Sequence, residues 1–237
     1  MKIIIMASFN SEHSASTQPD EDKAQEEDQE PPPSPRKELA RQQKERRAAY
    51  ADACAVKRQE AALNRGFERI QEFFGKDPRP GQRAVLGALY ESKDVILRAR
   101  TGFGKSLIFY GFLLMQPVDS KRDVTIIFTP LEGLGQQMMD DLNSYFEKRP
   151  KDDVLKVRSK TMKKGACFLD GSSTRDDIFR VGQGDFRWVF ITPEKAKSAP
   201  VIDMFKDQAF QAKVNLITVD EAHLVDEWYV ACQSSDH

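Results

Sequence analysis

The feature that most constrains the fold is a glycine-containing turn between two apolar runs. Val95-Ile96-Leu97 leads through Ala99-Arg100-Thr101-Gly102-Phe103-Gly104-Lys105-Ser106 into Leu107-Ile108-Phe109-Tyr110. This order predicts a strand, a loop and a helix. Small residues let successive backbone N–H groups turn toward a phosphate, and the helix N-terminus favours the same anion. The segment therefore predicts a phosphate-binding loop, with a plain turn before a buried helix as the simpler alternative.

The side chains of this loop fit a nucleoside triphosphate. Lys105 would reach the β- and γ-phosphates, and the Ser106 hydroxyl would hold Mg²⁺. The cofactor-binding residues expected before them are Thr101, Gly102, Phe103 and Gly104. The predicted cofactors are accordingly ATP and Mg²⁺.

Length and charge limit the function classes. The 237 residues, of which 40% are hydrophobic and 31% charged, suffice for one α/β core with a polar extension. A net charge of −1 gives no global attraction to a polyanion, so any nucleic-acid surface must be local.

The soft ligands and the N-terminus exclude further classes. The three cysteines are scattered and the three histidines complete no ligand pattern, so we expect neither zinc nor a disulfide framework. The apolar start, residues 1–6, is too short for a signal peptide or a membrane span. We expect a soluble intracellular protein without membrane contact, in the nucleus if the source is eukaryotic.

Composition divides the chain into three parts. Residues 1–35 form an acidic, Pro-rich stretch that we expect to be disordered. Residues 36–65 are basic and rich in Ala, Gln and Glu, which favours a charged helical linker. That linker is either a solvated helix or a tether for nuclear import or nucleic acid. The globular domain is expected over 66–237.

Within this domain, segments whose apolar residues follow a strand pattern alternate with segments whose apolar residues follow helical spacing. Strands are predicted at 95–97, 124–128, 188–191 and 214–219, and helices at 67–74, 84–90, 134–146, 174–181 and 202–212. Such alternation predicts an α/β fold, a parallel sheet with helices on both faces. Ligands of these sheets lie at the carboxyl ends of the strands.

The last predicted strand ends in Asp220-Glu221-Ala222-His223. Two adjacent carboxylates there suit a site in which Asp220 holds Mg²⁺ and Glu221 polarises the attacking water. Asp-Glu after a strand is by itself more often a turn or helix cap. Together with the phosphate loop, the pair predicts catalysis of phosphoryl transfer.

These motifs in this order resemble the first RecA-like lobe of superfamily 2 helicases, and among them the RecQ-like DEAH-type DNA helicases. The resemblance covers residues 67–228 and implies a P-loop NTPase fold and the ATP-binding lobe of an ATP-dependent 3'-5' DNA helicase. Lys105, Asp220, Glu221 and His223 would be catalytic, with His223 linking the ATP and DNA sites. Phe74-Gly75 and Arg79-Pro80-Gly81-Gln82 match the element that contacts adenine, and a Gln amide can pair with adenine N6 and N7. The spacing departs by one residue, and Pro78 replaces the usual aromatic.

The resemblance also implies contacts with single-stranded DNA. Thr129-Pro130-Leu131 and Thr192-Pro193-Glu194 match elements on the DNA side, and Trp228 matches the aromatic-rich loop that couples ATP to DNA. Thr-Pro pairs at strand ends are otherwise helix starts, with Thr as the cap.

The sequence stops before a second RecA-like lobe, so we expect a natural truncation or an incomplete gene product. The first lobe would bind single-stranded or forked DNA weakly. It would not unwind DNA alone, unless a partner supplies the second lobe. A non-catalytic nucleotide-binding module, regulatory or vestigial, and a lobe of another superfamily 2 translocase are the alternatives.

Overall fold

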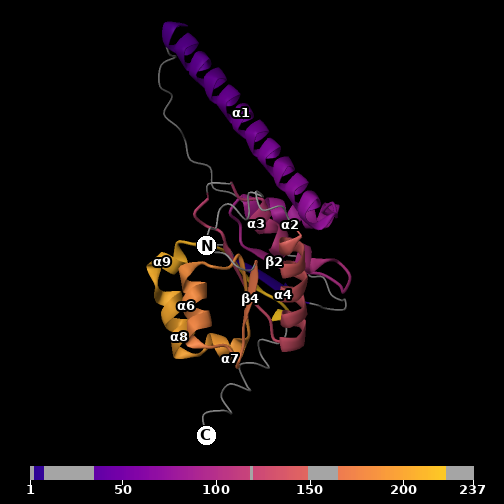
Figure 1. Ribbon diagram of the computed structural model, residues 1–237. Helices are drawn as coiled ribbons and strands as arrows, with labels where there is room; N and C mark the ends of the chain where they lie inside the picture. Colours follow the sequence, from indigo (N-terminus) through magenta and orange to yellow (C-terminus); the bar gives the residue numbers. More distant parts are fainter. Residues whose placement is uncertain (1–2, 8–34, 118–119, 149–164, 223–237) are drawn as a thin grey trace, which may run out of the picture. The chain divides into compact units, whose positions relative to one another are not determined.

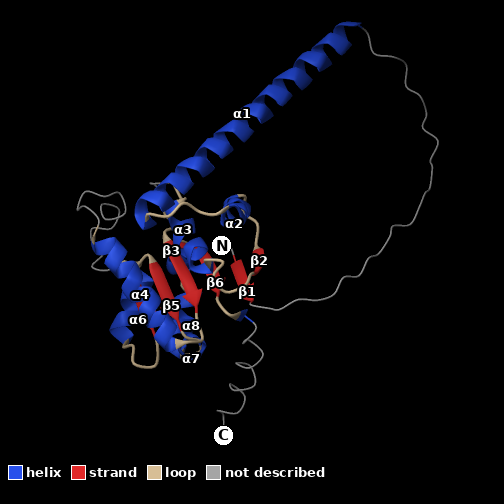
Figure 2. Ribbon diagram, turned by 90° about the vertical axis from the view of Figure 1, so that its right-hand side faces the viewer, coloured by secondary structure: helices blue, strands red, loops and turns tan. Residues whose placement is uncertain are grey.

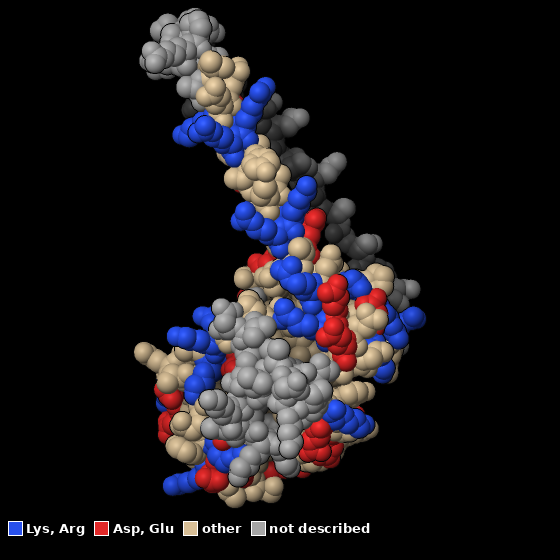
Figure 3. Space-filling view, turned by 45° about the horizontal axis from the view of Figure 1, so that its top comes forward, with Lys and Arg blue, Asp and Glu red and all other residues tan. Residues whose placement is uncertain are grey.

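The structure is a computed structural model that describes residues 3–7, 35–117, 120–148 and 165–222. Contacts divide the chain into two units, residues 10–62 and residues 1–9 with 63–237. The first unit is represented by the larger part of helix α1 (Pro35–Phe74). Its side chains are mostly exposed, and Arg41 pairs with Glu45 one turn later at 2.9 Å. Figure 3 shows Lys and Arg side chains along this helix. A role as a tether stays a prediction.

The second unit contains a sheet of six described strands, all paired in parallel. Their bounds are β1 Ile3–Ala7, β2 Val95–Arg98, β3 Val124–Phe128, β4 Ala166–Leu169, β5 Trp188–Ile191 and β6 Val214–Val219. The order across the sheet is β2-β1-β6-β3-β5-β4 (Figure 2). The phosphate-loop strand β2 and strand β4 thus form the two edges.

Helices cover both faces of this sheet. Beyond α1 they are α2 Pro80–Tyr90, α3 Lys105–Leu114, α4 Glu132–Glu147, α6 Arg175–Gln183, α7 Pro193–Ala196, α8 Ala199–Lys206 and α9 Gln208–Gln211. One core joins the end of α1 with α2, α3 and α4, and the other joins α6, α8 and α9. In Figure 1, α4 lies on one side of the sheet and α6, α8 and α9 on the other.

Alternate residues of one strand supply the two cores. In β5, Trp188 and Phe190 belong to the first core, whereas Val189 and Ile191 belong to the second. All four side chains are fully buried, as expected for a strand covered on both faces. The predicted α/β fold with a parallel sheet and helices on both faces is confirmed.

Two strands were not predicted from the sequence. Residues 3–7 were assigned to a disordered extension, but they form β1 in the middle of the sheet, between β2 and β6. That assignment is corrected for these five residues, because their β-branched apolar run has two strands to pair with. Strand β4 is the other omission.

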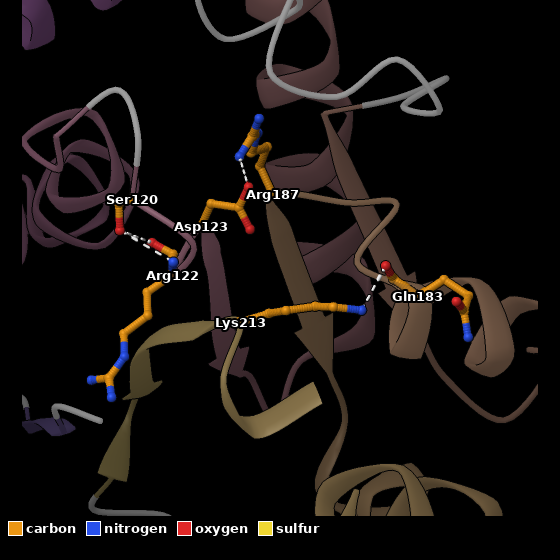
Figure 4. Close-up of polar contacts among 6 residues, drawn as sticks. All are labelled: Ser120, Arg122, Asp123, Gln183, Arg187 and Lys213. Carbon is orange, nitrogen blue, oxygen red and sulfur yellow. Dashed lines mark hydrogen bonds and ion pairs between the residues drawn. The ribbon is translucent and has the colours of Figure 1, made fainter. Parts of the chain in front are cut away.

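Charged side chains make polar contacts at the end of the sheet where the strands begin (Figure 4). The Arg187 side chain is 1% exposed and donates to the Asp123 carboxylate from the start of β5 to the start of β3. Lys213, before β6, donates from Nζ to the carbonyls of Gly182 and Gln183 at 3.1 and 2.8 Å. A cation at this position satisfies carbonyls at the end of α6 and complements the helix dipole. This end of the sheet, where the strands begin, is therefore structural. The opposite end, where the strands finish, is left for ligands.

Among the described residues, the helices are all too short or too polar to cross a membrane.

Candidate ATP-binding site

The phosphate loop connects the carboxyl end of β2 to the first residue of α3, Lys105. Gly102 and Gly104 have φ values of 81° and 83°, which glycine adopts without steric penalty. Gly104 is the N-cap of α3, and no described side chain caps that helix. An uncapped helix start presents backbone N–H groups and the positive end of the dipole. The loop is therefore built to receive an anion.

Gln82 braces this loop from α2. Its side chain is buried, and Nε2 donates to the carbonyl oxygens of Phe103 and Gly104, both at 3.0 Å. Its Oε1 accepts from the Arg79 backbone N–H at 2.8 Å. A Cβ at Gly104 would stand 2.5 Å from Gln82 Nε2. The left-handed backbone therefore favours glycine at residue 104, and a larger residue would also displace the Gln82 amide from the loop.

These contacts change the interpretation of the adenine-contacting element. Both the carbonyl and the amide of Gln82 are engaged with protein groups, and Arg79 Nη1 donates to the Gly102 carbonyl at 3.2 Å. Gln82 and Arg79 thus hold the phosphate loop. The predicted role in adenine selection stays a prediction.

The acidic pair lies at the carboxyl end of β6. Asp220 is 5% exposed, and its backbone N–H donates to the Phe128 carbonyl at 2.9 Å. Glu221 has a φ of 50°, a left-handed conformation that non-glycine residues adopt mainly at constrained sites. Its Oε1 accepts from Lys105 Nζ at 3.0 Å. The structure thus joins the phosphate loop and the acidic pair, 116 positions apart.

Ser106 lies in the same cluster. It makes a side-chain hydrogen bond with Tyr110, one turn later in α3. Burial raises the pKa of the Tyr110 hydroxyl far above its usual value, the Ser106 contact lowers it in part, and the negative charge of Asp220 raises it further. Tyr110 thus interacts with both Ser106 and Asp220, the two residues expected to hold Mg²⁺.

A cavity of about 520 Å³ opens beside the loop, within the size range of small-molecule sites. Gln82, Gly104 and Ser106 line one wall and Asp141 and Tyr145 of α4 the other. The cavity and the loop together offer room for a small ligand next to the phosphate loop.

Comparison with protein families matches residues 79–235 to the DEAD/DEAH box helicase family. The chain belongs to this family. The match contains the phosphate loop, the acidic pair and the element from Arg79 to Gln82.

The curated relatives extend the comparison. The chain is 27% identical over 161 residues to the mouse bifunctional 3'-5' exonuclease/ATP-dependent helicase WRN, which covers 67% of this chain and 10% of the relative. It is 26% identical over 147 residues to the rat ATP-dependent DNA helicase Q5, at 62% and 14% coverage. It is 27% identical over 166 residues to the human U5 small nuclear ribonucleoprotein 200 kDa helicase, an alignment that covers 70% of this chain and 7% of the relative. The chain thus spans a small part of these relatives' length. The resemblance to RecQ-like DNA helicases is confirmed as a distant one.

The helicase lobe places the expected DNA-contacting threonines inside the protein. Thr129 is fully buried, and Thr192 is 1% exposed. Thr192 is the N-cap of α7, where its hydroxyl accepts from the Lys195 N–H at 3.2 Å. Neither hydroxyl faces a polyanion in this state, because each strand end turns directly into a helix. Pro130 is partly exposed, and His223 and Trp228 lie outside the described residues.

Sequence reasoning missed the α4 wall of the cavity. Asp141 and Tyr145 stand four residues apart on one helix and therefore on one face. Their spacing was visible in the sequence, but nothing there placed α4 beside α3. Tyr110 was assigned to the apolar run after the loop, and its hydroxyl contact with Ser106 was likewise not predicted.

Proposed function

We propose that this chain is the ATP-binding and nucleic-acid-binding lobe of a RecQ-like, ATP-dependent 3'-5' DNA helicase. The observation that carries the proposal is the Lys105–Glu221 contact of 3.0 Å, which unites the phosphate loop and the acidic pair at one edge of the sheet. Family membership supports ATP use in general, and the names of relatives such as the DNA helicase Q5 support DNA as the nucleic acid.

The chemistry follows from the charges at this edge. Lys105 and Glu221 neutralise each other in the resting state, with side chains 13% and 23% exposed. On ATP binding, Lys105 would exchange the carboxylate for phosphate oxygens. Glu221 would then be free to orient a water molecule and to accept its proton. The strained backbone of Glu221 fixes where that carboxylate points.

The residues present also fit magnesium. Asp220 and Ser106 offer a carboxylate and a hydroxyl, and oxygen donors are the ligands that Mg²⁺ prefers. When bound, Mg²⁺ would neutralise charge on the phosphates.

The DNA-binding part of the proposal rests on the exposed turn between β3 and α4. Leu131 is 52% exposed there, next to partly exposed Pro130. Backbone N–H groups at a helix start can bind a DNA phosphate without the threonine hydroxyls. Such binding would be weak and would tolerate different sequences.

Similarity to the U5 200 kDa helicase supports a second candidate. Its 27% identity equals that of the WRN relative, so a lobe of another superfamily 2 translocase has comparable sequence support. A lobe that binds nucleotide without turnover is the third candidate.

The proposal is tested by binding of a fluorescent ATP analogue in the presence of Mg²⁺. Lys105→Ala should weaken binding at least tenfold, because it removes the cation that reaches the phosphates. Lys93→Ala is the control, since Lys93 is 65% exposed and pairs with the surface residue Glu91. Equal affinity of the two variants would contradict a phosphate-binding role for the loop.

A further inference from the structure

The inference concerns the place of β1 in the sheet. Strand β2, which carries the phosphate loop, pairs with β1, and β1 pairs with β6, which carries the acidic pair. Among the described strands, β1 is the sole partner of β2. The two halves of the ATP site are therefore joined through five residues at the N-terminus of the chain.

The register shows that β1 contacts both neighbours over its length. Ile4 lies opposite Val95 on one side and Thr218 on the other, and Ile5 lies opposite Ile96 and Val219. Both pairings are parallel. A strand in this slot must therefore run in one direction, must be free of proline, and suits β-branched residues. The sequence Ile3-Ile4-Ile5-Met6-Ala7 meets these requirements.

We propose that the slot between β2 and β6 is a binding site for one extended apolar peptide segment, occupied by residues 3–7 of the same chain. The segment is separate in sequence from the rest of its unit, which resumes at Leu63. It acts as a docked peptide that completes the sheet from both sides, and its removal leaves β3, β4, β5 and β6 paired with one another.

Occupation of the slot sets the geometry of the ATP site. Neighbouring strands lie about 4.8 Å apart, so two strands on either side of a third are about 10 Å apart. This spacing brings Lys105, after β2, within 3.0 Å of Glu221, after β6. With the slot empty, no backbone hydrogen bond would connect the two strands, and the Lys105–Glu221 contact would lose its support.

The first test places proline in β1 of the full chain. Ile5→Pro removes an N–H from the centre of the pairing, whereas the control Ile5→Val keeps a β-branched residue. Amide hydrogen exchange should show at least tenfold faster exchange of Val95–Arg98 in Ile5→Pro alone, with β3 and β5 protected as in the parent. Unchanged protection of β2 would overturn the proposal. General loss of protection would overturn it too, because β1 would then be an integral part of the core.

The second test separates the segment from the lobe. A protease site is introduced within residues 8–34, the purified chain is treated with the matching protease, and a fluorescent peptide of residues 1–9 is added to the cleaved product. The labelled peptide should exchange into the cleaved protein, raising its anisotropy, and unlabelled peptide should compete. The same peptide with Ile5→Pro should not bind. Absence of exchange, or equal binding of the proline peptide, would contradict a sequence-dependent strand site.

Neither readout uses nucleotide, so the strand site and the proposed function can fail separately. If both the strand site and the proposed function hold, Ile5→Pro should bind the fluorescent ATP analogue at least tenfold more weakly than Ile5→Val does. If the intact chain binds no nucleotide but exchanges the peptide, the proposed function fails and the strand site stands.

Discussion

Gln82 illustrates how one residue can serve a site without touching the ligand. Its amide donates to two carbonyls of the phosphate loop and its carbonyl accepts from Arg79. The two bonds to the loop hold it in a conformation whose left-handed backbone at residues 102 and 104 glycine allows, and the third fixes Gln82 to the start of α2. A glutamine that reads adenine and one that braces the loop affect different ligands, so the two roles can be separated.

We expect Gln82→Ala to weaken the binding of ATP, GTP and inorganic triphosphate by a similar factor. The two lost bonds to the loop contribute about 1 kcal/mol each, and about 2 kcal/mol corresponds to a roughly 30-fold loss of affinity. Competition against the fluorescent ATP analogue measures all three ligands. Gln136→Ala is the matched control, since Gln136 is exposed and donates to Asp140 of its own helix. A loss confined to ATP would show instead that Gln82 reads the base.

Elements differ in how far the sequence predicts them. Strand β6 was predicted within its observed bounds because Val214–Val219 is long and rich in β-branched residues. Strand β4 begins with Ala and Cys and spans four residues, too few for a clear periodicity. Strand β1 has the strongest β-forming composition, but its neighbours are about 90 and 215 residues away along the chain, and local patterns do not contain that information.

The same limit applies to the site. The phosphate loop and the acidic pair were predicted because their backbone needs dictate residue types, Gly at 102 and 104 and carboxylates after a strand. The buried hydroxyl of Thr129 and the engaged amide of Gln82 were not, because both depend on which element packs against them.

The ionic edge of the sheet gives a prediction for β3 and β5. Arg187→Met should destabilise the protein by about 1 to 3 kcal/mol, because it removes the charged hydrogen bond from a buried guanidinium to the Asp123 carboxylate, which is 26% exposed. Urea unfolding followed by circular dichroism measures this change. Lys206→Met serves as the control, since Lys206 is 74% exposed and lies 4.0 Å from Asp203, a pair that contributes little. Equal midpoints for the two variants would contradict a structural role for the Arg187 contact.

At the scale of the whole molecule, the described residues of the second unit form one RecA-like lobe. In related NTPases, an arginine at the γ-phosphate contributes about 10³ to 10⁵ in rate, and in many it comes from another protein or domain. The described contacts bring Lys105 and Arg79 to the phosphate loop, both from within the lobe.

We therefore expect the purified 237-residue chain to bind Mg-ATP but to hydrolyse it slowly and to unwind no DNA. Steady-state ATPase assays with and without single-stranded DNA, beside a duplex-unwinding assay, measure this. Glu221→Gln is the control for contaminating activity. Rapid DNA-stimulated turnover that persists on dilution and disappears in Glu221→Gln would contradict the expectation, whereas turnover lost on dilution would indicate that a second copy completes the site.

The central place of β1 also has a consequence for synthesis on the ribosome. Residues 3–7 precede both of their partner strands in the chain, and the second partner, β6, ends at Val219. This strand must therefore wait until Val219 has been made before both of its edges are paired. During that interval an isoleucine-rich segment remains available to other chains and to chaperones. Pairing between such distant residues also slows folding, so the insertion of β1 between β2 and β6 is a late step in assembling this lobe.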